Sequence, residues 1–248
     1  MAERLARNKN IKVNLSNCRY ELDTLQYVIA KNGFQELLKQ PGLGDVLWYG
    51  TALRDNDLEV IKRNENAIFN RYPLMDHFAK KNIMSVILSR LQRFFPEDYS
   101  FVPEYYLLPD ECEELDEHMH KYPGQTFIAK PSKGKAGRGI KLLKQFSELP
   151  KAAFENEYLL QRYIENPLTI QGKKFDVRLY LVIWGIDPIE AYFCSEGLAR
   201  FCTHQYQKPN RDNLKNVYMH LTNYSVNKKS KRFCAPGEEF KTNDKSHK

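Results

Sequence analysis

The sequence has no apolar run that approaches the ~20 residues needed for a membrane-spanning helix. Its best candidate, residues 177–184, is interrupted by Arg178. The first twelve residues hold four basic residues and no apolar core, so they lack the pattern of a secretory signal. We therefore expect no transmembrane segment.

Cysteine is also scarce. The chain has five cysteines, an odd number, and no two of them stand in Cys-x-x-Cys spacing. This pattern argues against a disulfide framework and against a zinc site. A reducing, cytoplasmic setting is the simplest interpretation.

The residues that are present are typical of a folded protein. The 248-residue chain is 42% hydrophobic and 12% aromatic, which is too apolar for a disordered tail. Lys and Arg number 38 against 31 Asp and Glu, so the net charge is +7. This excess favours an acidic partner. Composition alone leaves nucleic acid, anionic lipid and an acidic protein tail open.

Hydrophobic periodicity predicts a mixed α/β protein, class α/β (α+β). A strand at 11–15, a helix at 24–38 and a strand at 45–49 indicate a small βαβ lobe at the start of the chain. An amphipathic helix is predicted at 80–95 and an acidic helix at 110–121. Further strands are predicted at 126–129, 140–143, 158–161, 175–184 and 189–193, and a mobile basic loop at 227–232.

A glycine-rich segment, residues 129–140, lies between two of these strands. Glycines allow backbone N–H groups to approach phosphate oxygens, and Lys130, Lys133, Lys135 and Arg138 supply positive charge. The segment matches neither the Walker A nor the G-x-G-x-x-G pattern. A phosphate-binding loop and an ordinary basic hairpin are therefore equally open from this segment alone.

Two strands carry polar residues at unusual positions. Gln161, at the end of a strand, could face the polar edge of an adenine together with the backbone of residues 162–164, although an edge strand with a polar turn is the simpler alternative. On the next strand, alternation places Lys174, Asp176 and Arg178 on one face. Three charged side chains on an otherwise apolar strand are costly unless they meet a ligand or each other.

Two further clusters follow in residues 196–201 and 220–225. Arg200 could clamp a carboxylate or phosphate, or form an ordinary surface ion pair. Thr222 and Asn223 could line a site or cap a turn.

Taken together, these motifs resemble the tubulin tyrosine ligase-like family in order and spacing. The resemblance rests on segments 13–20, 70–73, 161–164, 174–178, 196–201 and 220–224. The family's catalytic core has the ATP-grasp fold. The resemblance thus implies a small N-terminal lobe at 1–72, a central ATP-grasp lobe at 73–164 and an incomplete C-terminal lobe at 165–248.

The resemblance also implies roles for individual residues. Arg138, Arg178 and Arg200 would be catalytic, and Arg200, Tyr224 and Lys248 would hold the incoming amino acid, with Arg138 also reaching the protein substrate. The ATP-binding residues would be Lys130, Arg138, Gly139, Gln161, Arg162, Tyr163, Ile164, Lys174, Phe175, Asp176, Thr222 and Asn223. Mg²⁺ would be required, and its ligands in this family, an Asp and a Glu-x-Asn pair, are expected beyond Lys248.

The implied reaction adds free L-glutamate to glutamate side chains in acidic tubulin tails through an acyl phosphate. Residues 18–20 and 196–201 are similar to the glutamylating branch of the family. A glycine or tyrosine ligase, or a truncated microtubule-binding module without activity, are the alternatives. We expect a monomer that binds neither nucleic acid nor membranes and lies on microtubules, in a cilium or basal body. Because the closing strands of the fold are missing, we expect this chain to bind ATP poorly and to have little ligase activity.

Overall fold

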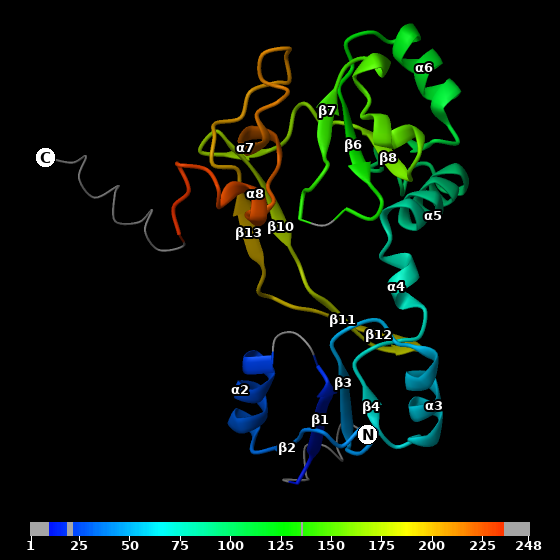
Figure 1. Cartoon of the computed structure of the whole chain (residues 1–248), viewed down its shortest axis with the longest axis vertical. Coiled ribbons are helices and arrows are strands. Elements are labelled where there is room, and N and C mark those ends of the chain that lie inside the picture. The colour runs from blue at the N-terminus through cyan, green and yellow to red at the C-terminus, as the bar shows by residue number, and fades with distance from the viewer. Residues whose placement is uncertain (1–9, 19–21, 135, 236–248) are drawn as a thin grey trace, which may run out of the picture. The chain divides into compact units, whose positions relative to one another are not determined.

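The computed structural model describes residues 10–18, 22–134 and 136–235 (Figure 1). The chain divides into two compact units, a first unit, Met1–Met84, and a second unit, Ser85–Lys248. The division into three lobes at residues 72/73 and 164/165 stays a prediction. In the described part of the chain, no helix is both long and apolar enough to cross a membrane.

The first unit is built on a parallel four-stranded sheet in the order β2-β1-β3-β4. The strands are β1 (Lys12–Asn17), β2 (Gln35–Leu37), β3 (Val46–Tyr49) and β4 (Ile68–Phe69), and the helices are α2 (Leu22–Asn32), α3 (Asp55–Arg63) and α4 (Met75–Phe78). Alternate residues of β1, Val13 and Leu15, pack with Ile29 of α2 in the core. Figure 1 shows α2 and α3 on either side of the strands. The predicted βαβ arrangement is confirmed.

The predicted helix at 24–38 was too long, because α2 ends at Asn32. Gly33 follows with a φ of 67°, a left-handed conformation that glycine adopts without strain. The N–H of Phe34 then bonds to the carbonyl of Ile29 at 3.0 Å, which closes the last turn. The next residues extend and pair with β1 as strand β2.

The second unit begins with α5 (Lys81–Phe94), which starts just before its boundary and confirms the helix predicted at 80–95. An antiparallel sheet follows in the order β5-β8-β6-β7. Its elements are β5 (Tyr105–Leu108), α6 (Cys112–Lys121), β6 (Phe127–Pro131), β7 (Lys141–Leu143), the 3₁₀ turns η1 (Phe146–Glu148) and η2 (Lys151–Phe154), and β8 (Tyr158–Arg162). One face of the sheet packs on α6 around Leu115, Phe127 and Leu160, each fully buried.

A second group of strands carries most of the charged motifs. It consists of β9 (Thr169–Ile170), β10 (Lys173–Arg178), β11 (Leu181–Ile186), β12 (Ile189–Phe193) and β13 (Leu198–Phe201), followed by the short helices α7 (Val217–His220) and α8 (Tyr224–Asn227). Sheet β13-β10-β9 and hairpin β11-β12 are separate ladders. Figure 1 shows α7 and α8 beside β10 and β13.

One expectation about this region was wrong. The single strand predicted at 175–184 is two strands, β10 and β11. The two chain segments that connect β10 to β11 and β12 to β13 differ in length. Arg178 pairs with Leu198 and Leu181 pairs with Phe193, so residues 179–180 on one side lie opposite the four residues 194–197 on the other. Regular strand pairing is therefore interrupted there. The basic segment 227–232 has two buried residues, Asn227 at 2% and Ser230 at 8% exposure, and its mobility stays a prediction.

Candidate active site

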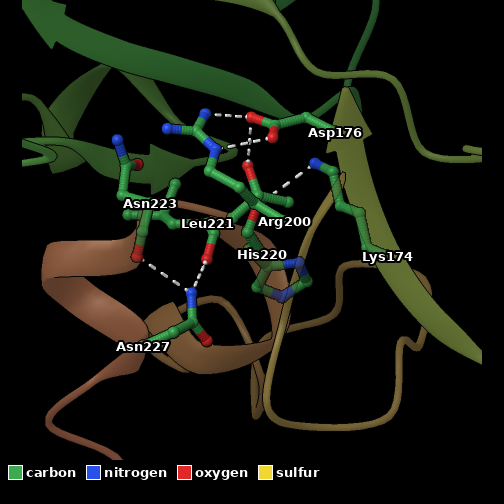
Figure 2. A network of polar contacts seen from close by, with 8 residues as sticks. Lys174, Asp176, Arg200, His220, Leu221, Asn223 and Asn227 are labelled. Carbon is green, nitrogen blue, oxygen red and sulfur yellow. Dashed lines mark hydrogen bonds and ion pairs between the residues drawn. The ribbon is translucent and has the colours of Figure 1, made fainter. Parts of the chain in front are cut away.

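Three parts of the second unit meet at one cluster of polar side chains: strands β6 and β8, strands β10 and β13, and the segment from α7 to α8. Figure 2 shows the contacts of β10, β13 and the α7–α8 segment. The first contact joins β6 to β8. In their antiparallel register Ile128 lies opposite Gln161, so Lys130, two residues further on, projects from the same face as Gln161. Lys130 Nζ donates to Gln161 Oε1 at 2.6 Å.

Lys174 of β10 is the centre of the cluster. Its Nζ donates to the Tyr163 hydroxyl at 2.8 Å and to the His220 carbonyl at 3.1 Å, and it lies 4.3 Å from the centre of the Tyr163 ring. Burial lowers the pKa of Lys174 from 10.5 to about 8, and the nearby charge of Lys130 acts in the same direction. Two lysines are thus held close enough to repel each other.

Asp176 lies two residues further along β10, directly opposite Arg200 of β13. Arg200 Nε donates to Asp176 Oδ1 at 2.7 Å, and Nη2 donates to the other carboxylate oxygen. Thr222 Oγ1 donates to the same oxygen at 2.8 Å. Burial alone would raise the pKa of Asp176, but the hydrogen bonds from Arg200 and Thr222 outweigh it, so the pKa is lowered.

The segment that carries Thr222 is fixed by Asn227. Its Nδ2 donates to the carbonyls of Leu221 (2.7 Å) and Asn223 (3.1 Å), while its Oδ1 accepts from the N–H (2.9 Å) and hydroxyl (3.1 Å) of Thr203. Figure 2 shows Asn227 bridging Leu221 and Asn223 below the Asp176–Arg200 pair. One buried amide therefore ties the segment to the residues that follow β13.

The glycine-rich loop lies against the same segment. Ser225 Oγ donates to the carbonyl of Ala136 at 2.8 Å. Gly137 has a φ of 77°, and a Cβ added to it would come within 2.9 Å of Val226 and 3.1 Å of Asn223. A side chain does not fit there without displacing the segment, which explains a glycine at this position.

Polar groups around the loop suit an anion. Ser132 Oγ is shielded from solvent and has no hydrogen-bond partner within the described part of the chain. Lys130 and Lys174 converge with Arg200 nearby, and Arg178 is close enough for its charge to lower the pKa of Asp176. Lys174, Arg178 and Arg200 thus act on one carboxylate, and Lys130 lies close enough to Lys174 to lower its pKa, so positive charge is in excess here.

Residues 60–248 match the tubulin-tyrosine ligase family. The chain belongs to this family. Tubulin polyglutamylase TTLL6 of Mus musculus is 34% identical over 227 residues, which are 92% of this chain and 27% of the relative. Tubulin polyglutamylase TTLL11 of Mus musculus is 35% identical over 232 residues, 90% of this chain and 31% of the relative. A probable beta-tubulin polyglutamylase of Tetrahymena thermophila is 37% identical over 191 residues, 76% of this chain and 16% of the relative. The chain therefore spans less than a third of the length of these relatives.

The structure brings together many of the residues singled out from the family motifs. Direct contacts join Lys130 to Gln161, Lys174 to Tyr163, and Asp176 to Arg200 and Thr222. Asn223 lies against the glycine-rich loop. Arg138 and Gly139 are exposed on that loop.

Other residues predicted to bind ATP or the amino acid contact side chains outside this polar cluster or lie outside the described residues. Phe175 stacks on Phe201, with ring centres 5.6 Å apart. Tyr224 is 57% exposed and its ring edge contacts Phe233. Lys248 lies outside the described residues, as do residues 19 and 20 of the first family motif.

Arg162, Tyr163 and Ile164 line an open pocket of about 520 Å³ together with Thr126 and Glu165. Within this group the N–H of Tyr163 already donates to the carbonyl of Thr126 at 2.8 Å. The N–H of Arg162 likewise donates to the carbonyl of Glu104 at 2.8 Å, so both N–H groups would have to change partner to face an adenine. Ile164 is 58% exposed.

Sequence reasoning assigned no role to His220 or Asn227, which are 1% and 2% exposed. In the sequence, the one indication of a role was that both residues lie close to Thr222 and Asn223. That position does not show that their side chains are buried. Among the described residues, no group of three or more His, Cys, Asp or Glu side chains could hold a metal ion.

Proposed function

We propose that this chain is the nucleotide-binding and acceptor-binding part of an ATP-dependent ligase that adds L-glutamate to glutamate side chains in tubulin C-terminal tails. The observation that carries the proposal is the convergence of Lys130 and Lys174 beside the Asp176–Arg200 pair in a member of the tubulin-tyrosine ligase family. The relatives named as tubulin polyglutamylases support tubulin as the substrate and glutamate as the added amino acid.

The cluster supports a triphosphate as the anion. Lys130 and Lys174 would offset phosphate charge, and the glycine-rich loop would lie over the phosphates, with the Ser132 hydroxyl available as a further donor. Asp176 would accept from ribose hydroxyls, and Gln161 would face the base. Mg²⁺ would neutralise the remaining phosphate charge. We propose that its ligands come from outside the described residues.

ATP supplies the phosphoryl group that activates the acceptor. The side-chain carboxylate of a tail glutamate takes up that group, ADP leaves, and the resulting acyl phosphate is attacked by the amine of free glutamate. Phosphate leaves, the amine loses a proton and an isopeptide bond remains. Arg178 and Arg200 would hold the developing negative charge, and Arg200 with Tyr224 would orient the incoming amino acid.

An exposed basic turn next to the cluster supports an acidic substrate. Its buried anchors are Asn227 and Ser230. The exposed cations between and after them are Lys228, Lys229, Lys231 and Arg232. Because α8 contacts the glycine-rich loop through Ser225, an acidic tail bound to this basic turn would lie beside the proposed phosphate site.

The test is incorporation of radiolabelled amino acid into tubulin. The protein, extended past Lys248 to include the expected Mg²⁺ ligands, is incubated with Mg-ATP, tubulin and labelled glutamate, glycine or tyrosine in separate reactions, and with tubulin whose tails have been removed by limited proteolysis. We expect labelling by glutamate only, dependent on ATP and on the tails. Lys174→Met should reduce labelling at least tenfold, whereas Lys151→Met, an exposed lysine outside the cluster, should not.

Two outcomes would change the assignment. Labelling by glycine or tyrosine alone would place the chain in another branch of the family. Binding to microtubules without any labelling, together with no heat of Mg-ATP binding in isothermal titration, would leave a non-catalytic binding module.

A further inference from the structure

A chain of hydrogen bonds runs behind Lys174, away from the proposed phosphate site. Lys174 Nζ donates to the Tyr163 hydroxyl at 2.8 Å, and that hydroxyl lies 3.1 Å from His220 Nδ1. His220 Nε2 lies 3.1 Å from the carbonyl oxygen of Asn213. None of the roles proposed above uses His220, yet it is 1% exposed and lies edge-on to the rings of Tyr163 and Tyr206.

The chemistry of these groups fixes the direction of each bond. A carbonyl oxygen only accepts, so His220 Nε2 must carry the proton that goes to Asn213. In a neutral imidazole Nδ1 is then an acceptor, and the Tyr163 hydroxyl donates to it. The neighbouring Tyr206 hydroxyl, also a hydrogen-bond partner of Tyr163, gives its own proton to the carbonyl of Glu165 at 2.7 Å. The lone pairs of the Tyr163 oxygen are thereby directed to Lys174. Burial, with the nearby charge of Lys174, lowers the pKa of His220 and keeps the ring neutral.

We propose that His220 and Tyr163 are positioning residues for Lys174: the neutral Nε2–H tautomer of His220 orients the Tyr163 hydroxyl as an acceptor, which holds the Lys174 ammonium charged and directed at the anion site. The identity of that anion as a nucleoside triphosphate rests on the proposed function. The hydrogen-bond chain itself does not, because it is formed entirely by residues of this chain.

The surroundings of Lys174 explain why an oriented acceptor is needed. Lys130 on β6 repels the ammonium, while Asp176 on β10 and the buried Cys202 after β13 favour it. The thiol of Cys202 has a pKa raised to about 11 by burial, so it is neutral near pH 7 and offers little compensation. Within the described residues, the Tyr163 oxygen and the His220 carbonyl are therefore the two hydrogen-bond acceptors that hold this buried ammonium.

The pKa of Lys174 is the direct readout, and it needs no nucleotide. Trace acetylation with acetic anhydride at a series of pH values, quantified by mass spectrometry, gives the titration midpoint of one lysine in the full chain. Side-chain NMR of Lys174 gives the same midpoint independently. The wild-type midpoint is expected near pH 8.

Three single variants separate positioning from packing. Tyr163→Phe keeps the ring and removes the acceptor, so the midpoint should fall by about one unit or more. His220→Asn places an amide oxygen near the position of Nδ1 and should leave the midpoint near that of the wild type. His220→Gln places its polar end near Nε2, retains a donor for Asn213 and loses the acceptor for Tyr163, so its midpoint should fall.

The double variant Tyr163→Phe/His220→Gln decides the mechanism. If His220 acts only through the Tyr163 hydroxyl, the double variant should show no further fall beyond Tyr163→Phe. Additive shifts, equal shifts for His220→Asn and His220→Gln, or an unchanged midpoint in Tyr163→Phe would overturn the proposal. Should a His220 variant fail to fold, as seen by circular dichroism, Tyr163→Phe alone still decides whether the hydroxyl supports the ammonium.

Nucleotide binding distinguishes this proposal from the proposed function. Tyr163→Phe should weaken ATP binding several-fold at pH 7 and more strongly at pH 9, since more of Lys174 is then neutral. A shifted midpoint in a protein that binds no nucleotide would retain the positioning role and remove the triphosphate assignment. An unshifted midpoint removes the positioning role whatever the protein binds.

Discussion

The Asp176–Arg200 pair joins β10 to β13 and can be tested without any ligand. The two residues face each other in the antiparallel register and form a bidentate contact, which Thr222 extends with a third hydrogen bond. The perturbation is a double-mutant cycle with Asp176→Asn, Arg200→Met and the double variant. Asparagine keeps the shape of the carboxylate, and methionine keeps the apolar stem of the arginine.

The size of the coupling follows from partial burial. Exposed ion pairs contribute about 0.2–1 kcal/mol, whereas breaking a fully buried pair costs about 3–5 kcal/mol. The side chains of Arg200 and Asp176 are 23% and 36% exposed, so this pair lies between those limits. With bidentate geometry we expect a coupling of about 1–2 kcal/mol, which decreases in 1 M salt because solvent reaches both groups.

The assay must report locally, because two compact units need not unfold together. Hydrogen exchange measured by mass spectrometry on peptides that cover β10 and β13 gives the free energy of opening of this ladder. The control is a cycle on Lys62 and Glu59, an exposed pair within α3 whose side chains are 70% and 55% exposed. If the Asp176–Arg200 coupling is no larger than the control coupling, the pair does not hold these strands and the reasoning is wrong.

Three further changes test other parts of the structure. The pKa of Lys174 is lowered to about 8, so the folded chain binds fewer protons than the unfolded chain between pH 8 and 10.5. Wild-type stability relative to Lys174→Met should therefore rise across that window by roughly 3 kcal/mol, measured by denaturation at each pH. Gly137→Ala should cost more than Gly33→Ala in thermal unfolding, although both have positive φ, because a Cβ at 137 meets Val226 at 2.9 Å and one at 33 meets nothing within 4 Å. The expected costs are about 2 and about 1 kcal/mol. Asn227→Ala should cost about 2–4 kcal/mol in denaturant unfolding, since it removes the partners of buried backbone groups.

Local sequence patterns predicted most elements of the fold, and the errors occurred where distant residues decide the outcome. The helix predicted at 24–38 matched an apolar spacing that continues past Gly33, but the chain instead extends to pair with β1. The strand predicted at 175–184 is continuous in β propensity. Its interruption depends on how many residues the opposing segment, 194–197, inserts into the ladder. The end of α2 and the break between β10 and β11 therefore depend on residues outside the segments in which they occur.

In the candidate site, too, local patterns predicted some features, and contacts between distant residues decided others. Strand alternation correctly placed Lys174 and Asp176 on one face, because both side chains reach residues 220–222. Pairing of Asp176 with Arg200 needed the register of β10 and β13, which no local pattern supplies. The burial of His220 needed the packing of two tyrosine rings from other segments. Its sequence neighbours suggested a site, while its own role depends on three-dimensional contacts.

These contacts also constrain how a ligand could bind. Gln161 accepts from Lys130, and Asp176 accepts from Arg200, so a nucleotide that used either group would exchange one hydrogen bond for another. Such exchanges yield only about 0.5–1.5 kcal/mol each. The convergent lysines differ, because burial and mutual repulsion already disfavour the charged form of Lys174. An anion between them would remove that penalty, so the phosphates, rather than the base or ribose, are the part of a nucleotide from which this cluster can draw most of its affinity.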